Sequence, residues 1–134
     1  MDPKGLAAAA LVAAGGALGA LARHWITIAL TRPGIRFPYG ILVCNVAGCL
    51  AIGAIMWFVV RRPILPPAVR LGVVVGLLGS LTTFSTFGYD TIELSRQGHT
   101  AQAVWNVLAN LALGLGAVAL GLWTASLVSP APAH

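Results

Sequence analysis

The residues best suited to chemistry in this sequence form a nine-residue run, Gly79–Phe87, which reads GSLTTFSTF and lies inside an apolar stretch near the middle of the chain. It contains five hydroxyl side chains and two phenylalanines. Lipid-facing helices are mainly aliphatic, so polar side chains at membrane depth normally face other protein or a water-filled path. The run is rich in hydrogen-bond donors and carries no charge, which suits a small ion or polar solute that passes between helices.

Three asparagines add to this polar set. Asn45 lies in the apolar stretch before the run, and Asn106 and Asn110 lie four residues apart in the stretch after it, hence on one helix face. A single asparagine in a membrane span is often a link between helices, worth about 0.6 to 2 kcal/mol, and that alternative stays open for each one alone. Three asparagines together with the hydroxyl run are more than helix linking requires, so we expect a solute path.

The donors favour an anion as the solute. No apolar stretch carries an Asp or Glu deep inside it, so the carboxylate that cation and proton carriers use is missing. Amides and hydroxyls donate hydrogen bonds, and the edges of Phe rings carry partial positive charge. The formal net charge is +5. Arg23, near the end of the first apolar stretch, either extends to the membrane interface or attracts anions into a vestibule.

Composition indicates which class of protein must position these residues. Hydrophobic residues make up 58% of the 134-residue chain and charged residues 8%, whereas soluble domains are about 25% charged. Four stretches are as long as the roughly 20 residues that a spanning helix needs. We predict an all-α, multi-pass integral membrane protein with one four-helix transmembrane domain over residues 1–134, with helices at about 5–30, 38–60, 68–95 and 99–128. The first stretch is longer than a signal-peptide core, so we expect a retained span.

The third helix has two alternative forms at the polar run. Gly79 and the β-branched pair Thr82 and Thr83 are weak helix formers. If the helix breaks there, the freed carbonyls need partners, and such carbonyls commonly hold a cation. Otherwise the hydroxyls bond back to the preceding turn and bend the helix slightly, which is the simpler expectation from the residue types alone.

The charges between the helices give no clear orientation, although cytoplasmic loops normally carry an excess of Lys and Arg. The side with the N-terminus carries four such residues: Lys4, Arg61, Arg62 and Arg70. The opposite side carries three: Arg32, Arg36 and Arg96. Counting Arg23 with this side brings the number to four. Either a weak bias fixes one orientation, or the chain inserts both ways up and two copies pair as an antiparallel dimer.

Small residues at helical spacing favour close packing of the helices. The pairs that lie four residues apart are Gly15/Gly19, Gly16/Ala20, Ala47/Ala51 and Gly72/Gly76. Such pairs suit contacts in any multi-span protein. Four helices alone enclose little interior, however, so polar residues on several of them are easier to bury in an oligomer.

Three segments resemble one known family, the Fluc (CrcB) fluoride channels. The run Gly79–Phe87 resembles their G-G-x-T-T-F-S-T-F signature, Asn45–Gly53 resembles the N-x-x-G-S-F-x-x-G motif of their second helix, and Gly15–Arg23 is similar to their glycine-rich, Arg-ending first helix. The chain departs from the pattern at a few positions, which are Ser80 for the second glycine, Cys49-Leu50 for Ser-Phe, Asp90 for a frequent Glu, and Asn106 and Asn110 where an aromatic or hydroxyl residue is common.

This resemblance implies a fluoride-selective channel, formed by an antiparallel, dual-topology homodimer with a broken third helix and two pores. The residues it assigns to the pore are Phe84 and Phe87 as edge-on rings, with Asn45, Ser85, Thr86, Asn106 and Asn110 as polar lining. It implies a structural sodium ion at the dimer centre, held by the backbone carbonyls of Gly79 and Thr82. Arg23 would lie in the vestibule, and the expected location is the plasma (inner) membrane of a bacterium or archaeon.

Two other classes of protein are weighed against the channel. A small multidrug-type transporter also has four short spans, but it needs a membrane carboxylate to couple protons to export. A non-conducting assembly subunit would explain the small-residue pairs but not the polar run. The sequence shows no nucleophile–base pair, phosphate loop or nucleic-acid surface, so we expect no enzyme activity and no nucleic-acid partner.

Overall fold

The computed structural model describes residues 2–61 and 66–128, and every regular element in that part of the chain is helical. The first two helices are α1 (Pro3–Leu30) and α2 (Tyr39–Arg61). A third span follows in four pieces: α3 (Pro67–Leu71), the π-helical η1 (Gly72–Leu78), α4 (Gly79–Leu81) and α5 (Phe84–Arg96). The last helix is α6 (Thr100–Val128).

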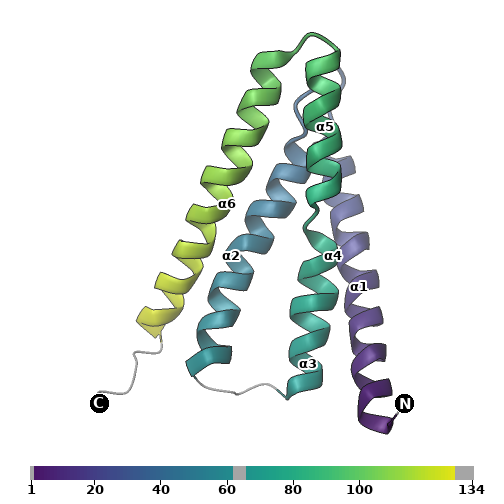
Figure 1. Cartoon of the computed structure of the whole chain (residues 1–134), viewed down its shortest axis with the longest axis vertical. Coiled ribbons are helices and arrows are strands. Elements are labelled where there is room, and N and C mark those ends of the chain that lie inside the picture. Colours follow the sequence, from purple (N-terminus) through teal and green to yellow (C-terminus); the bar gives the residue numbers. More distant parts are fainter. Residues whose placement is uncertain (1, 62–65, 129–134) are drawn as a thin grey trace.

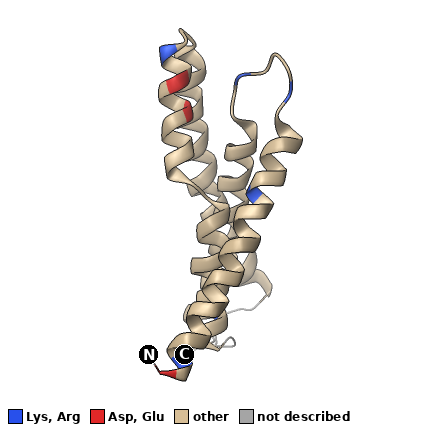
Figure 2. Cartoon of the chain, turned by 90° about the vertical axis from the view of Figure 1, so that its right-hand side faces the viewer, with Lys and Arg blue, Asp and Glu red and all other residues tan. Residues whose placement is uncertain are grey.

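Four segments are long and apolar enough to cross a membrane. They are Pro3–Leu30, Tyr39–Val60, Pro67–Arg96 and Thr100–Val128, with mean hydropathy between 1.6 and 2.2. The prediction of an all-helical, multi-pass membrane protein is therefore confirmed. Coloured by charge, the chain is mostly uncharged, and most of its charged residues lie toward the two ends of the molecule (Figure 2). Of the residues counted for orientation, Arg62 lies outside the described part of the chain.

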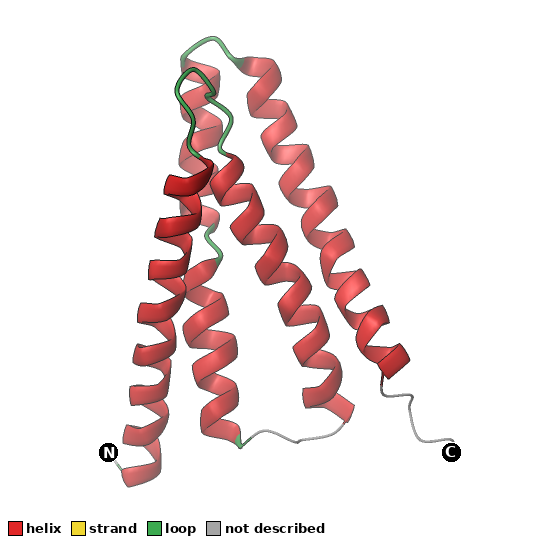
Figure 3. Cartoon of the chain, turned by 180° about the vertical axis from the view of Figure 1, so that it is seen from behind, coloured by secondary structure: helices red, strands yellow, loops and turns green. Residues whose placement is uncertain are grey.

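The helices form two pairs. α2 packs along α6, and α1 packs along η1, α4 and α3 of the third span. The two pairs diverge toward the end of the molecule where α1 begins and α6 ends (Figure 1). Viewed from behind, the loops between α1 and α2 and between α5 and α6 lie together at the opposite end (Figure 3).

Local signals explain where several helices begin and end. Asp2 caps α1 by accepting a hydrogen bond from the Gly5 amide at 2.6 Å. Gly98, with φ +82°, follows the end of α5. There the His99 amide donates to the Leu94 carbonyl at 2.8 Å and the Gly98 amide to the Ser95 carbonyl at 3.0 Å. This pair of bonds is a Schellman motif, which requires a left-handed residue that glycine adopts without strain.

Glycines bring the backbones of the paired helices into contact within the chain. A Cβ atom on Gly15 would lie 2.1 Å from the Gly72 carbonyl oxygen, and one on Gly19 would lie 2.1 Å from that of Leu77. In the other pair, a Cβ atom on Gly121 would lie 2.3 Å from the Leu50 carbonyl oxygen. The glycines of α1 and η1 therefore pack two helices of one chain together and give no support to pairing between chains.

Candidate functional site

The third span is interrupted inside the polar run. Thr82 (φ −82°, ψ 153°) and Thr83 (φ −153°, ψ 121°) are extended, so the ribbon loses its helical turn between α4 and α5 (Figure 1). Gly79 itself keeps helical angles at the start of α4. The Thr82 hydroxyl also donates to the Leu78 carbonyl at 3.0 Å. The back-bonding that the residue types favour is thus present, and it lies immediately before the interruption.

Asn45 of α2 satisfies the backbone at this interruption. The Thr83 amide donates to Asn45 Oδ1 at 2.9 Å, and Asn45 Nδ2 donates to the Thr83 carbonyl at 3.4 Å. In a continuous helix the Thr83 amide would instead bond to the Gly79 carbonyl. The approach of α2 is close, since a Cβ atom on Gly48 would lie 2.3 Å from Thr82 Cγ2. The Asn45 side chain therefore replaces the helical acceptor that the Thr83 amide lacks, and adds a second donor to the carbonyl of this N-cap residue.

The three asparagines form a single hydrogen-bonded chain between α2 and α6. Asn45 Nδ2 donates to Asn110 Oδ1 at 2.9 Å, and Asn110 Nδ2 donates to Asn106 Oδ1 at 3.0 Å. Asn106, which is 0% exposed, donates to Thr91 Oγ1 at 2.8 Å. The Thr91 hydroxyl in turn donates to the Phe87 carbonyl at 2.8 Å. The chain thus runs from the interruption through α6 to the backbone that carries Phe87.

The two phenylalanines contact each other but differ in burial. Their ring centroids lie 5.4 Å apart, with an angle of 60° between the planes. Phe87 is 9% exposed, whereas Phe84 is 82% exposed. Tilted rings at this distance bring the positive edge of one toward the negative face of the other. Phe87 therefore lies in the protein interior, and Phe84 lies on its surface.

Thr83 organises the first turn of α5. Its hydroxyl accepts from the Thr86 amide at 3.3 Å, as an N-cap residue does. The same hydroxyl lies 3.1 Å from Ser85 Oγ and 3.2 Å from Thr86 Oγ1. Three hydroxyls are therefore grouped at the point where the helix resumes.

A cavity of about 370 Å³ lies against the interruption, with walls from α2, the third span and α6. Of the residues expected at the site, it is lined by Asn45, Gly79, Thr82, Phe84, Phe87 and Asn110. Ser85, Thr86 and Asn106 adjoin these residues but are not part of its wall. Among the residues that the structure describes, no charged one lines the cavity. An ion there would be held by dipoles and ring edges rather than by an opposite charge.

Carbonyls at the interruption, those of Gly79 and Thr82 among them, lose their helical donors. The Thr83 amide, which would reach the Gly79 carbonyl in a continuous helix, bonds to Asn45 instead. The Thr86 amide, which would reach the Thr82 carbonyl, bonds to the Thr83 hydroxyl. A hard cation such as sodium prefers oxygen ligands. The donor set at Gly79 and Thr82 therefore fits such an ion chemically.

Arg23 is not brought to the polar network. It is half-buried on α1, seven residues before that helix ends at Leu30, which corresponds to about 10 Å along the axis. It does not line the cavity at the interruption.

Two residues that make hydrogen bonds at this site, Thr83 and Thr91, are not among the site residues predicted from the sequence. Thr83 belongs to the polar run, and its position before an α-helix is typical of an N-cap, so sequence reasoning had a usable signal. Thr91 had none, because its partner Asn106 is 15 residues away and on another helix.

Known proteins resemble this chain over most of its length. The family model described as "CrcB-like protein, Camphor Resistance (CrcB)" matches residues 10–122, a range that includes the interruption, the asparagines and both phenylalanines. The chain is 44% identical over 114 residues to the "Fluoride-specific ion channel FluC" of Geobacter metallireducens, covering 82% of this chain and 90% of that protein. It is 45% identical over 112 residues to the protein of the same name from Acidobacterium capsulatum, covering 83% and 90%. It is 46% identical over 114 residues to "Fluoride-specific ion channel FluC 2" of Symbiobacterium thermophilum, covering 82% and 90%.

Proposed function

This chain belongs to the CrcB family, and from that premise we propose that it is a fluoride-selective ion channel that lets fluoride leave the cell passively, down its electrochemical gradient. The observation that carries the proposal is the uncharged cavity at the interruption, which Asn45, Asn110 and both phenylalanines line. The similar proteins of three bacteria are named as fluoride-specific channels. The activity is transport, with no covalent step.

The chemistry of the cavity supports an anion as the conducted species. An ion that enters must exchange its water for groups of the protein. The amides of Asn45 and Asn110 supply donors from the cavity wall, the hydroxyls of Ser85 and Thr86 lie beside it, and the Phe rings supply positive edges. Both amides are engaged with other protein groups in this structure. In the proposed mechanism fluoride therefore competes with an existing hydrogen bond, which limits passage to strongly accepting, small anions.

The asparagines take different parts in this proposal. Asn110 lines the cavity and would bind the ion by exchanging one of its hydrogen bonds to Asn106. Asn106 is completely buried and bonded to Thr91, which favours a role in positioning Asn110 and the backbone at Phe87. Arg23 would act from outside the cavity, by raising the local concentration of anions.

We further propose that two copies assemble as an antiparallel, dual-topology homodimer with two pores. Phe84 is 82% exposed and Ser85 is exposed, although both lie within a membrane-spanning segment. Polar groups at that depth normally face protein or water rather than lipid, so a second copy that covers this surface is favoured. The balanced Lys and Arg counts on the two sides support insertion in both orientations.

A structural sodium ion is part of the same proposal. The carbonyls of Gly79 and Thr82, which lose their helical donors, are the groups that would hold it. A bound cation would supply a fixed positive charge that joins the interrupted spans of the two copies. The proposed location is the inner membrane of a bacterium or archaeon.

Efflux from liposomes that hold the purified protein tests the proposal. Fluoride and chloride should be compared at equal gradients, with protein-free liposomes as the control. We expect rapid fluoride loss and negligible chloride loss. Equal loss of both ions would contradict selectivity, and no loss of either from a folded protein would favour the non-conducting assembly subunit.

A further inference from the structure

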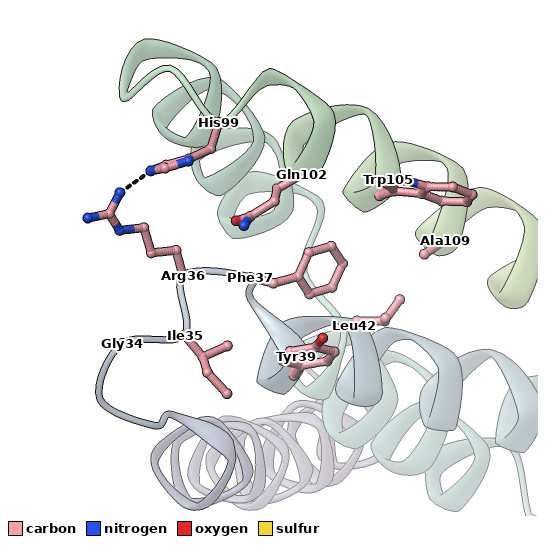
Figure 4. Close-up of a pocket in the computed structure, with 10 residues that line it drawn as sticks. All are labelled: Gly34, Ile35, Arg36, Phe37, Tyr39, Leu42, His99, Gln102, Trp105 and Ala109. Atoms are coloured by element: carbon pink, nitrogen blue, oxygen red, sulfur yellow. Dashed lines mark hydrogen bonds between the residues drawn. The ribbon is translucent and has the colours of Figure 1, made fainter.

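A second cavity, of about 740 Å³, opens at the end of the molecule away from the termini and shares no wall residue with the cavity at the interruption. Its walls come from the connector between α1 and α2, the first turn of α2, and the start of α6 (Figure 4). The conduction path proposed above leaves it without a role.

The outer end of this cavity is cationic. Arg36 on the connector donates a hydrogen bond to His99 Nε2, across the opening between the two loops (Figure 4). A guanidinium carries five N–H donors, so Arg36 keeps others free for a ligand. No acidic residue lines the cavity. An anion bound there would meet a positive charge without a competing carboxylate.

The backbone holds both sides of this opening in place. His99 is fixed by the Schellman motif at the end of α5, and its carbonyl accepts from the Ala103 amide in the first turn of α6 at 3.0 Å. On the other side, Gly34 has φ +82°, and the Ile35 amide donates to the Arg32 carbonyl at 3.1 Å. The turn that precedes Arg36 is therefore defined.

The inner end of the cavity is aromatic and contains one unsatisfied polar atom. Phe37 and Tyr39 contact each other with ring centroids 4.7 Å apart, and Trp105 of α6 is 65% exposed. Gln102 Oε1 is buried without a hydrogen-bond partner. A buried acceptor without a donor is costly, so a ligand that brings a hydroxyl or N–H group to Gln102 would gain from it.

The cavity lies close to the ends of the membrane-spanning helices. α1 ends at Leu30, α2 begins at Tyr39, the third span ends at Arg96 and α6 begins at Thr100, so all four spans have an end on the side of the cavity. Trp and Tyr are enriched at that level of a membrane. A ligand with an anionic head and an apolar tail would meet the cationic end toward water and the aromatic end toward lipid.

We propose that this cavity binds an anionic glycerophospholipid such as phosphatidylglycerol. Arg36 binds the phosphate, in the way that basic pockets between membrane helices bind acidic headgroups. A headgroup hydroxyl donates to Gln102 Oε1, and the first part of an acyl chain lies along Trp105. This inference does not rest on fluoride conduction.

Native mass spectrometry of the protein from micelles that contain equal amounts of phosphatidylglycerol and phosphatidylcholine, with identical chains, tests the proposal. Arg36→Gln is compared with Arg32→Gln, which lowers the net charge equally on the same connector but lies outside the cavity wall. We expect the wild type and Arg32→Gln to retain phosphatidylglycerol selectively and Arg36→Gln to bind it at least about tenfold more weakly, since hydrogen bonds between charged groups are the strong ones. Equal retention by the two variants, or no selective retention by the wild type, would overturn the proposal.

Further measurements distinguish a bound lipid from other ligands of this cavity. Arg36→Lys should keep most of the retention, and a loss as complete as in Arg36→Gln would show that charge is not what binds. Millimolar inorganic phosphate should not displace the lipid, and displacement would make the cavity a site for free anions. Fluoride efflux should be unchanged in Arg36→Gln, and reduced efflux with unchanged lipid retention would assign the cavity to the ion path.

Discussion

Before its interruption, the third span contacts α1 backbone to backbone, through Gly15, Gly19 and Gly72, whereas after it α5 is joined to α2 and α6 by side-chain hydrogen bonds. Van der Waals attraction stabilises the close contacts at these glycines, and almost no other residue fits at their positions. Hydrogen bonds between amides and hydroxyls can be exchanged for bonds to an ion or water. The third span therefore has two parts. The part before the interruption is closely packed and fixes where the interruption lies, and the part after it is polar and able to bind a solute.

The largest expected effect is loss of folding in the glycine-packed half. In Gly19→Ala the new Cβ would lie 2.1 Å from the Leu77 carbonyl oxygen, so the helices must separate. Overpacking of this kind costs about 1–3 kcal/mol, and more where a backbone must move. The free energy of unfolding in micelles measures it. Gly116→Ala is the matched control, because a Cβ there meets nothing within 4 Å; equal stability of the two variants would contradict close packing at Gly19.

The next effect is expected at the residue that joins the halves. Asn45→Leu leaves the Thr83 amide without its acceptor, and an unsatisfied buried group costs about 1–3 kcal/mol. Fluoride efflux should fall by at least about tenfold, since a rise of 1.4 kcal/mol in a barrier has that effect. Efflux per folded protein is the quantity to measure. Retained efflux would remove Asn45 from the site.

A smaller effect is expected at Thr91, which sequence reasoning did not select. Thr91→Val keeps the shape of the side chain but removes the link between Asn106 and the Phe87 carbonyl. Stability should fall by about 1 kcal/mol, with efflux reduced several-fold. Thr124→Val is the control, because within the described residues the Thr124 hydroxyl bonds only to carbonyls of its own helix. If both variants conduct equally, the network beyond Asn110 does not position Phe87 for conduction.

The smallest effect is expected at Arg23, which the structure leaves outside the cavity. Arg23→Gln should lower efflux slightly at low ionic strength and not at high ionic strength, because salt screens attraction at a distance. Efflux at two salt concentrations measures this. Equal efflux of Arg23→Gln and the wild type at low salt would contradict attraction of anions by Arg23 and favour a side chain that extends to the membrane interface.

The class of fold was predictable because it depends on local properties of the chain. Apolar length and low charge define four spans without knowledge of their packing. How the glycines are used was not predictable, because a pair such as Gly15 and Gly19 fits a contact within a chain as well as one between chains. The exact position of the interruption, at Thr82 and Thr83 rather than Gly79, depends on Asn45, which reaches it from another helix.

The candidate site was predictable in part for a similar reason. Asn106 and Asn110 lie four residues apart, so helical periodicity places them on one face, and the structure joins them by a hydrogen bond of 3.0 Å. The same periodicity places Phe84 and Phe87 together but gives no sign that one is exposed and the other buried. The link from Asn106 to Thr91 depends on how α5 and α6 align, and no spacing in the sequence encodes that.

The central claim is that fluoride passes the paired phenylalanines at the interruption. Fluoride efflux should be measured for Phe84→Ile and Phe87→Ile in liposomes, with Trp123→Leu, an exposed aromatic residue on α6 outside both cavities, as the control. Folding of each variant is verified first by its elution in micelles. The account predicts that efflux falls strongly in both Phe variants and stays at the wild-type rate in the control. Wild-type efflux from folded Phe84→Ile and Phe87→Ile would contradict it.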